Sequence, residues 1–366
     1  MKKVYILLIN YNGWKDTVAC VDSIIKNIYN NYQIIIVDNN STDGSVDNIS
    51  NWIKKSFKNK MKFLIYNQQE TDELTFIKTK DNKTSKEKFS PIIIIRSAFN
   101  NGFASGNNIG LKYGLSKGDS DYFWLLNNDT EIEKNSLSEM IQLAETDNNI
   151  GVVGSKLLFG FNHNIIQSLG NDHIGWNGVG HGSFDGISNN SKVPDYIRMK
   201  SVMGASFLIK NEVIKKIGLM DELYFMQVEE ADWCIKASKA GYGVITNTKS
   251  IVIHKDGKST ERERIEKYLL GRKFFRTNIK DYLMWGYYSF RNEIYFVKKN
   301  FGFMFILYCL YSLPIKYIIK LLMIFVFNDD YKIKRIYLLN RAVFDGLVSN
   351  MGKVIDPLEW KQQFKL

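Results

Sequence analysis

Apolar and polar positions alternate in blocks along the first 160 residues, and the blocks predict strands and helices in turn. Short runs rich in Ile, Val, Leu and aromatic residues end in Asn, Asp, Ser or Gly, which is typical of buried strands. Longer segments with helical spacing follow them. The expected strands are 4–9, 33–37, 62–66, 92–96 and 122–126, and the expected helices are 15–27, 45–57, 107–115 and 135–145.

Strands that alternate with helices predict a mostly parallel sheet covered by helices, so the fold class is α/β. The segment 68–90 is polar and rich in Lys and Thr, and we expect an exposed insertion without chemistry. The segment 160–200 is rich in Gly, Asn and His and predicts a long loop on the acceptor side. A strand at 206–209, helices from 212 and over 229–240, and strands at 243–246 and 250–253 complete a first domain, 1–257.

Composition indicates a globular chain in a reducing compartment. With 366 residues and 45% hydrophobic content the chain can bury a full core. The three cysteines, Cys20, Cys234 and Cys309, are far apart and form no CxxC pair, which argues against disulfides and a zinc site. The first apolar run is too short for a signal peptide and is interpreted as a strand. We therefore expect a cytoplasmic protein.

The positive charge is concentrated in the last third of the chain. Residues 1–254 carry 28 Lys and Arg against 27 Asp and Glu, whereas residues 255–366 carry 21 against 11. Here the basic residues are interleaved with apolar runs at 301–315 and 321–327, which favours a membrane surface over nucleic acid. Pro314, Lys316 and Lys320 interrupt these runs, so we expect a helical extension, 258–366, that lies on the membrane and does not span it. A buried helical subdomain or a homodimer interface is the alternative.

Two segments predict contacts to a nucleotide. Asp38 ends an apolar strand and precedes a Ser, Thr, Asp and Gly turn, where a parallel strand presents an acceptor to a ligand, although Asp38 and Asp43 could equally cap the next helix. The Gly-rich segment 100–110 lies between a strand and a helix, where backbone can approach a phosphate. Its spacing matches neither the dinucleotide fingerprint nor the P-loop, which disfavours a dehydrogenase and an NTPase.

A metal site is predicted where the strand 122–126 ends in Asn127, Asn128 and Asp129. Asp129 offers the hard oxygen that Mg²⁺ or Mn²⁺ requires, and Asn127 offers an amide oxygen. His254 ends another apolar strand and could complete the site, because imidazole accepts Mn²⁺. A simple turn and a structural histidine are the alternatives.

Three carboxylates at the start of one predicted helix indicate a general base. Glu229, Glu230 and Asp232 are flanked by aromatic and apolar residues, which predicts a partly buried site. Desolvation and like charge would raise a carboxylate pKa there. Glu230 is the candidate base and Glu229 and Asp232 are its supports, while favourable contacts with the helix dipole are the alternative explanation.

Together these residues resemble the inverting nucleotide-sugar glycosyltransferases of family 2, especially the rhamnosyltransferase-like branch that builds bacterial surface polysaccharides. The resemblance covers about residues 4–257, with a weaker echo at 287–292 and 345–347. It implies the GT-A fold and an Mn²⁺ or Mg²⁺ cofactor. It assigns donor contacts to Asn10, Asn12, Asp38, Asn40, Ser41, Asn101, Gly102, Asn107, Asn127, Asn128 and Asp129, metal ligands to Asp129 and His254, and the base to Glu229–Glu230. The expected acceptor contacts are Gly204 and Ala205 together with Trp176 in the long loop.

Two residues depart from the family pattern. Asn127 replaces the first carboxylate of the family's D-x-D motif, so metal binding would rest more on Asp129, His254 and the diphosphate. Glu230 stands where the family usually has aspartate, so Glu229 and Asp232 remain candidates for the base.

The resemblance implies transfer of a sugar from a nucleotide diphosphate, with dTDP-rhamnose or a UDP-hexose favoured, to a hydroxyl of a lipid-linked oligosaccharide at the inner face of the cell membrane. The sequence does not name the donor or the acceptor. A nucleotidyltransferase and a non-catalytic nucleotide-binding module are the alternatives, and a nucleic-acid-binding protein explains only the basic tail.

Overall fold

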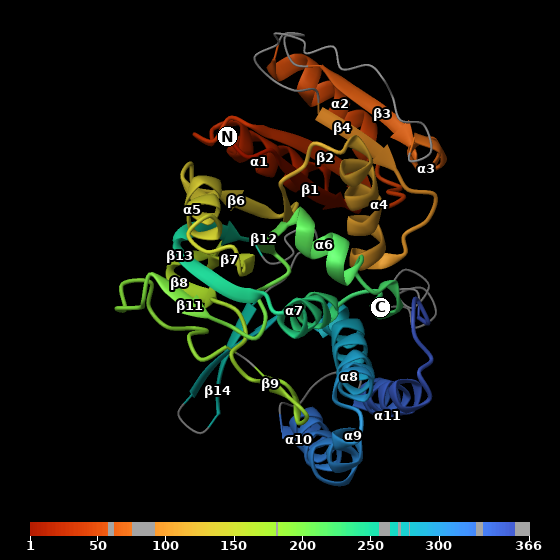
Figure 1. The fold of residues 1–366 in the computed structure, drawn as a ribbon. Coiled ribbons are helices and arrows are strands. Elements are labelled where there is room, and N and C mark those ends of the chain that lie inside the picture. The colour runs from red at the N-terminus through yellow and green to blue at the C-terminus, as the bar shows by residue number, and fades with distance from the viewer. Residues whose placement is uncertain are drawn as a thin grey trace.

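The computed structural model describes residues 1–57, 62–74, 92–180, 182–255, 264–269, 272–277, 279–326 and 332–355. Its centre is a twisted sheet in the strand order β11-β13-β7-β12-β5-β1-β2-β4-β3 (Figure 1). The strands from β5 to β3 in this order are parallel, β13 is parallel to β7, and β12 runs antiparallel between the two groups. The path consists of β1 (Val4–Asn10), β2 (Tyr32–Asp38), β3 (Phe63–Asn67), β4 (Ile92–Arg96), β5 (Tyr122–Asn127), β7 (Ile150–Phe159), β11 (Tyr196–Arg198), β12 (Ser206–Lys210) and β13 (Gly243–His254), and β6 (Thr130–Ile132) and β8 (Asn162–Ser168) pair at its side.

Helices cover both faces of the sheet because its central strands are apolar on both faces. In β1, Ile6 and Leu8 pack into one buried cluster and Tyr5 and Leu7 pack into another. Successive side chains of a strand point to opposite faces, so a strand buried on both faces is a continuous apolar run. The first cluster lies under α1 (Trp14–Ile25), α2 (Ser45–Ser56) and α5 (Ser136–Ala144), and the second under α4 (Gly102–Lys117), α6 (Asn211–Ile217) and α7 (Glu229–Lys239).

A third apolar cluster joins a C-terminal helical extension to the sheet domain, beyond α7 (Figure 1). Tyr224, the last residue of the short helix η1 (Glu222–Tyr224), and Phe225 after it are buried in this cluster against Tyr287, Tyr288 and Phe290. The extension consists of the hairpin β14 (Arg264–Leu269) and β15 (Arg272–Thr277), followed by α8 (Ile279–Phe301), α9 (Met304–Leu307), the π-helical turn η2 (Tyr308–Ser312), α10 (Leu313–Val326) and α11 (Lys332–Val348).

Several expected elements differ in the structure. The segment 160–200 contains β8, which pairs with the preceding β7, the hairpin of β9 (Ile174–Gly175) and β10 (Gly178–Val179), and β11, which pairs with the distant β13. The expected strands 243–246 and 250–253 are one bulged strand. The helix expected at 107–115 already begins at Gly102. Of the expected insertion 68–90, residues Gln68–Leu74 form α3, and residues 75–90 lie outside the described part of the chain.

The apolar part of the extension is longer than the sequence suggested. From Met304 to Phe325 the chain is helical over 22 residues, long and apolar enough to cross a membrane by length and composition, with 11% of its central window buried. Pro314 does not end the helix, which passes through the π-helical turn η2 directly before α10, and local π geometry is one way in which a helix accommodates a proline. The expected interruption is therefore wrong.

Candidate functional site

The predicted donor residues lie together at one edge of the sheet because their strands are parallel and in register. Asn10 at the end of β1 pairs with Asp38 at the end of β2. On the other side of β1, Ile9 pairs with Asn127 at the end of β5. The carboxyl ends of strands in an open α/β sheet form the edge where ligands bind.

Asn10 is the centre of a buried polar network at this edge. Its Nδ2 donates to Asp38 Oδ1 at 2.7 Å and to Ser41 Oγ at 3.0 Å. Its Oδ1 accepts from Thr17 Oγ1 at 2.8 Å, and Ser41 N donates to Asp38 Oδ2 at 3.0 Å. Because every member has a partner inside the protein, the edge has its shape before a ligand binds.

The turn after β1 and the turn after β2 are bonded to each other. Asn12 N donates to Ser41 Oγ at 2.9 Å, and Thr42 N donates to Asn12 Oδ1 at 2.8 Å. Asn12 and Asn40 both have positive φ, 51° and 61°, a conformation that asparagine tolerates better than most residues. Asn40 is exposed above this junction, where a donor molecule would meet it.

The Gly-rich segment forms the start of α4 and packs tightly against two turns. Asn39 Nδ2 donates to Gly102 O at 2.9 Å. A Cβ on Gly102, whose φ is 90°, would lie 1.9 Å from Phe225 O, so only glycine fits there. Asn101 is exposed at the N-terminus of the helix, whereas the Nδ2 of Asn107 donates back to Phe103 O at 3.0 Å.

Asp129 and His254 lie side by side, as the metal hypothesis requires. The distance from His254 Nε2 to Asp129 Oδ1 is 3.2 Å, and the pairing of β13 with β6 places His254 beside Thr130. His254 Nδ1 is 2.8 Å from Gln167 Oε1. With its Nδ1 proton donated to that amide oxygen, His254 can offer the Nε2 lone pair to a cation held between the imidazole and the carboxylate of Asp129.

This donor set fits a divalent cation only in part. A carboxylate oxygen and an imidazole lone pair are ligands that Mn²⁺ accepts. Among the described residues, however, no three His, Cys, Asp or Glu side chains gather closely enough to hold an ion by themselves. The remaining ligands would have to come from elsewhere, and the diphosphate of a bound nucleotide has suitable oxygens.

The two asparagines before Asp129 have different positions. Asn128 turns toward α1, where its Nδ2 donates to Thr17 Oγ1 at 2.9 Å and lies 3.5 Å from Asn10 Oδ1. Asn128 therefore supports this edge of the sheet from the side of α1. Asn127 is partly exposed at the end of β5, and its backbone N–H donates to Ala205 O at 2.9 Å.

Glu230 lies against the predicted acceptor segment. A Cβ on Gly204 would lie 3.6 Å from Glu230 Cδ and 3.7 Å from Phe103 Cε1. The side chain therefore fills a narrow space beside the Gly204 backbone. Burial raises the pKa of Glu230, while backbone hydrogen bonds from Ala231 and Gly204 pull that pKa back down. A carboxylate with a raised pKa that is still hydrogen-bonded to N–H groups suits a general base.

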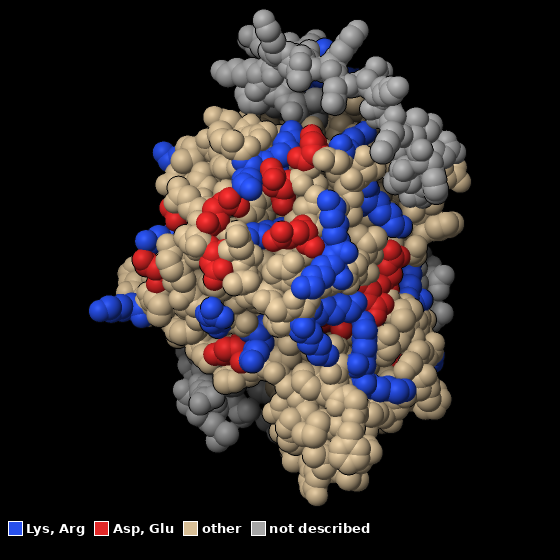
Figure 2. Space-filling model, viewed as in Figure 1, with Lys and Arg blue, Asp and Glu red and all other residues tan. Residues whose placement is uncertain are grey.

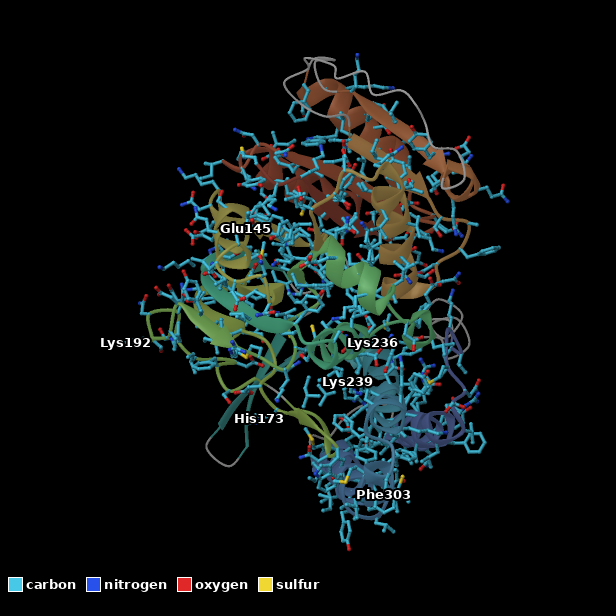
Figure 3. The ribbon with its side chains drawn as sticks, in the orientation of Figure 1. Glu145, His173, Lys192, Lys236, Lys239 and Phe303 are labelled. Atoms are coloured by element: carbon cyan, nitrogen blue, oxygen red, sulfur yellow. The ribbon has the colours of Figure 1, made fainter. Side chains whose placement is uncertain are left out.

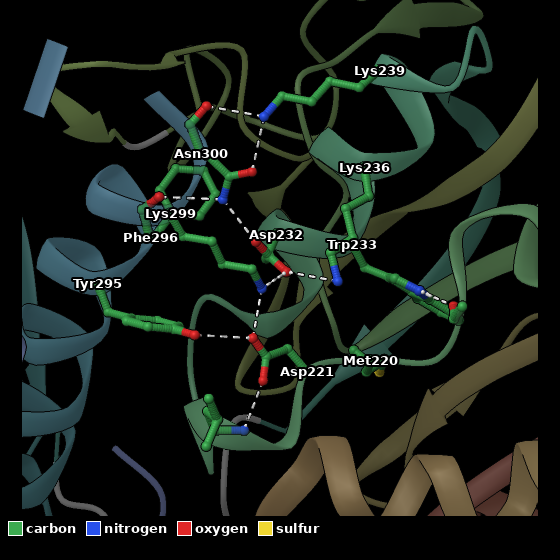
Figure 4. Close-up of polar contacts among 12 residues, drawn as sticks. Met220, Asp221, Asp232, Trp233, Lys236, Lys239, Tyr295, Phe296, Lys299 and Asn300 are labelled. Atoms are coloured by element: carbon green, nitrogen blue, oxygen red, sulfur yellow. Dashed lines mark hydrogen bonds and ion pairs between the residues drawn. The ribbon is translucent and has the colours of Figure 1, made fainter. Parts of the chain in front are cut away.

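The other two carboxylates of this motif have different surroundings. Glu229 is only 4% exposed, and its Oε2 has no hydrogen-bond partner within the described part of the chain. Burial and the charge of Glu230 hold the pKa of Glu229 well above its usual range. Asp232 points to the extension, where Lys299 Nζ and Asn300 Nδ2 lie 2.8 and 2.7 Å from its oxygens (Figure 4). Asp232 thus links α7 to α8.

The acceptor-side hairpin β9–β10 contacts the extension as well. Trp176 packs against the third apolar cluster, and a Cβ on Gly178 would lie 2.5 Å from Lys316 Nζ and 2.6 Å from Glu293 Oε1. Lys316 Nζ is itself 2.8 Å from Glu293 Oε1. The predicted acceptor loop is therefore attached to α8 and α10.

Sequence reasoning missed several residues that shape the site. Thr17 and Asn39 could have been suspected from their position beside Asn12 and Asp38. Gln167 has no signal in the sequence, because it reaches the site from β8. Asn292 lies in the segment 287–292 that echoes the family weakly, but nothing in the sequence shows that it reaches the turn before α7 from α8. Their roles depend on long-range packing alone.

The sequence of this chain matches a family model and a protein of known activity. The model of the family "Glycosyl transferase family 2" matches residues 5–73 and 71–207. The low-salt glycan biosynthesis hexosyltransferase Agl10 of Haloferax volcanii is 25% identical over 170 residues, which are 45% of this chain and 53% of Agl10. The chain thus aligns with about half the length of that relative.

Two solved structures share the fold. The mannosyltransferase PcManGT from Pyrobaculum calidifontis, in complex with GDP-Man and Mn²⁺, has a TM-score of 0.51 and 11% identity and covers 94% of this chain and 87% of its own. GalNAc-T7 with UDP, GalNAc and Mn²⁺ has a TM-score of 0.52 and 15% identity and covers 81% of this chain and 48% of its own. The expected GT-A architecture is confirmed.

Proposed function

Because the chain belongs to glycosyl transferase family 2, we propose that it transfers a sugar from a nucleotide diphosphate to a hydroxyl of a lipid-linked glycan. The observation that carries this proposal is one juxtaposition. The network of Asn10 and Asp38 and the pair of Asp129 and His254 lie at one sheet edge, and Glu230 lies beside Gly204 next to that edge.

The donor would lie across the ends of β1, β2 and β5. Asp38 and the turn of Asn40 and Ser41 would contact the nucleoside, and the start of α4 would face the sugar or diphosphate.

Asp129 and His254 would hold Mn²⁺ or Mg²⁺, which supplies positive charge to the diphosphate when bound. The Mn²⁺ in both solved relatives supports this assignment. dTDP-rhamnose and UDP-hexoses are the proposed donors, and the hexosyltransferase relative supports a hexose.

The proposed reaction is a single displacement with inversion at the anomeric carbon. The acceptor hydroxyl oxygen forms the new bond to that carbon as the bond to the nucleoside diphosphate breaks, and the diphosphate leaves with the electron pair. Glu230 takes the hydroxyl proton. Glu230 is favoured over its neighbours because Glu229 is buried behind it and Asp232 is paired with Lys299.

The acceptor hypothesis rests on the apolar surface of the extension. On the face shown in Figure 2, the end formed by α9 and α10 carries no Lys, Arg, Asp or Glu, and the body beyond it carries many. Phe303 lies at this end, whereas Lys236 and Lys239 lie on the body (Figure 3). The exposed apolar side chains of this surface are Phe303, Ile306, Leu310, Tyr311, Ile315, Ile318, Ile319, Leu322, Met323 and Phe325.

We place this apolar surface on the cytoplasmic face of the membrane, lying along it. The charged residues of α10 face the protein, since Lys316 pairs with Glu293 and Lys320 lies 5.0 Å from the Phe290 ring centre. The side of α10 that faces away from the protein is therefore apolar, like the apolar face of a helix that lies in a membrane interface. The same helices hold the acceptor hairpin of Trp176, which would bring a lipid-linked acceptor to Glu230.

A nucleotide screen tests the catalytic proposal. Thermal shift with dTDP-, UDP- and GDP-sugars in Mn²⁺, Mg²⁺ or EDTA should show a metal-dependent rise in Tm with one nucleotide class, because a ligand of the native state stabilises it. Release of the nucleoside diphosphate should follow when acceptor lipids are added. Release of pyrophosphate would instead point to a nucleotidyltransferase, and stabilisation without any product would point to a binding module.

Flotation with vesicles tests the membrane proposal. The double variant Ile318→Glu, Leu322→Glu should bind anionic phospholipid vesicles at least about tenfold more weakly, because each buried apolar side chain contributes about 1.5–3 kcal/mol. Ile28→Glu is the matched control, since Ile28 is an equally exposed isoleucine on the sheet domain. Equal flotation of all three proteins would reject this surface as the membrane contact.

A further inference from the structure

The turn that precedes the base motif has an unusual backbone. Between η1 and α7, Phe225, Gln227 and Val228 have φ values of 64°, 74° and 76°. Positive φ is uncommon for residues other than glycine, and for a β-branched residue such as Val228 it is a clear outlier. Such conformations persist only where the surroundings hold them, and they gather at functional sites. The next residues of the chain are Glu229 and Glu230, so the turn sets the direction of the base.

One side chain from the extension holds this turn. Asn292 is fully buried in α8, and its Nδ2 donates to the carbonyl oxygens of Tyr224 at 2.9 Å, Met226 at 2.7 Å and Gln227 at 2.8 Å. An amide group has two hydrogens, so the three carbonyls share them. A single asparagine thus bonds three carbonyl oxygens of the turn that contains the positive-φ residues.

Arg291 fixes that asparagine in place. Its Nε donates to Asn292 Oδ1 at 3.0 Å, and its Nη2 donates to Tyr224 O at 3.1 Å. The guanidinium is itself fully buried, 4.6 Å from the Tyr288 ring centre, and Nη1 donates to Gly352 O at 2.9 Å. Since Asn292 Oδ1 is occupied by Arg291, its NH₂ group can only face the turn.

The opposite side of the turn reaches the donor site. Phe103 N, in the first turn of α4, donates to Phe225 O at 2.8 Å. Gly102 passes so close to the same carbonyl that no side chain fits between them. The turn therefore lies between α8 on one side and the Gly-rich start of α4 on the other, and Asn292 sets the distance between donor site and base.

We propose that Asn292 is a positioning residue for the transfer reaction. It acts through the 224–228 turn, which it holds in the left-handed conformation that keeps Glu230 against Gly204. It touches neither donor nor acceptor. This inference rests on the proposed function, because it takes Glu230 as the base.

Steady-state kinetics of Asn292→Ala, with donor and acceptor varied separately, provide the test. The kcat should fall about 100-fold, as expected when a reacting group is misplaced by about 1 Å, while the donor Kd stays within about twofold. The acid limb of the pH profile of kcat/KM should move to higher pH, because the Gly204 contact that lowers the pKa of Glu230 is weakened. Asn340→Ala is the control, since Asn340 only accepts from the exposed Tyr317 hydroxyl in the same extension.

A rescue distinguishes positioning from general stabilisation. Glycine adopts positive φ readily, so the double variant Asn292→Ala, Gln227→Gly should have a kcat at least about tenfold higher than that of Asn292→Ala alone. If Asn292→Ala does not fold, Asn292→Asp serves instead, because it keeps the oxygen that Arg291 binds, while a carboxylate oxygen that cannot donate to the three carbonyls replaces the NH₂ group. Unchanged kcat and pH profile in Asn292→Ala, or the absence of rescue by Gln227→Gly, would overturn the inference.

The Glu230→Gln variant separates this inference from the proposed function. Full turnover by Glu230→Gln would reject Glu230 as the base, and the role of Asn292 would fall with it. An inactive Glu230→Gln beside a fully active Asn292→Ala would reject the positioning role alone.

Discussion

The donor side and the acceptor side of the site are built in different ways. On the donor side, Asn10, Asp38 and Ser41 lie at the ends of neighbouring parallel strands and satisfy one another. On the acceptor side, the 224–228 turn has an unfavourable backbone conformation and is held by Asn292 from the extension. We therefore expect substitutions in the extension, far from the sheet edge, to lower kcat more than they lower the affinity for the donor.

The largest effect that sharpens this comparison is expected from Glu230→Gln. Removal of a general base should lower kcat by about 10³-fold, while donor affinity stays unchanged because the donor edge is separate. In the wild type, activity should rise with pH through the raised pKa of Glu230, since only the ionised form accepts a proton. Initial-rate assays across pH and nucleotide titration by calorimetry measure both.

Glu133→Gln is the matched control for this experiment, because Glu133 is an exposed glutamate away from the donor edge. A Glu230→Gln variant that loses donor affinity along with turnover would break the distinction between the two sides.

The next effect is expected on the donor side, from Asp129→Ala. Metal-dependent nucleotide binding should weaken by roughly 10- to 100-fold, a range seen even when residues that only support metal ligands are removed. Binding in EDTA should hardly change. Calorimetry with and without Mn²⁺ measures this, and Asp195→Ala controls for it because Asp195 only pairs with Lys249 on the surface. Equal affinities of wild type and Asp129→Ala in Mn²⁺ would remove Asp129 from the metal site.

The smallest effect is expected from Glu229→Gln. The folded state raises the pKa of Glu229, so it binds the proton more tightly than the unfolded chain does. Folding stability is therefore lost as pH rises through the raised pKa, and a neutral glutamine avoids this loss. At pH 8 the variant should be about 1 kcal/mol more stable than the wild type, and at pH 4 the two should be equal.

Urea unfolding at the two pH values measures this difference, and kcat of Glu229→Gln should stay within about tenfold of the wild type. A collapse of kcat as large as that of Glu230→Gln would show that the two carboxylates act as a coupled pair.

The gathering of the proposed donor residues at one sheet edge was largely predictable from the sequence, for a physical reason. A strand end is visible as an apolar run followed by a polar residue, and parallel strands bring such ends together without further information. Asn10, Asp38 and Asp129 were found in this way. The family and the fold followed from the same residues and are confirmed.

The acceptor side could not be predicted to the same extent, because its geometry depends on partners far along the chain. Asn292 reaches the turn from 65 to 68 residues away, and the hairpin β9–β10 contacts Glu293 and Lys316 of the extension. The early start of α4 at Gly102 was missed because glycines usually indicate a loop, whereas here they permit close packing against Phe225.

The bond between Asn292 and the 224–228 turn also has a consequence for the order of events during synthesis. The ribosome makes the sheet domain first, and the donor edge is complete once β5 and β13 have paired with their neighbours. The turn cannot take its working conformation until α8 has emerged and the segment after α11 has placed Gly352 O against Arg291. Domains fold from the N-terminus as they are made. A nascent chain would thus bind its donor before it can transfer the sugar, so activity begins only when the extension is in place.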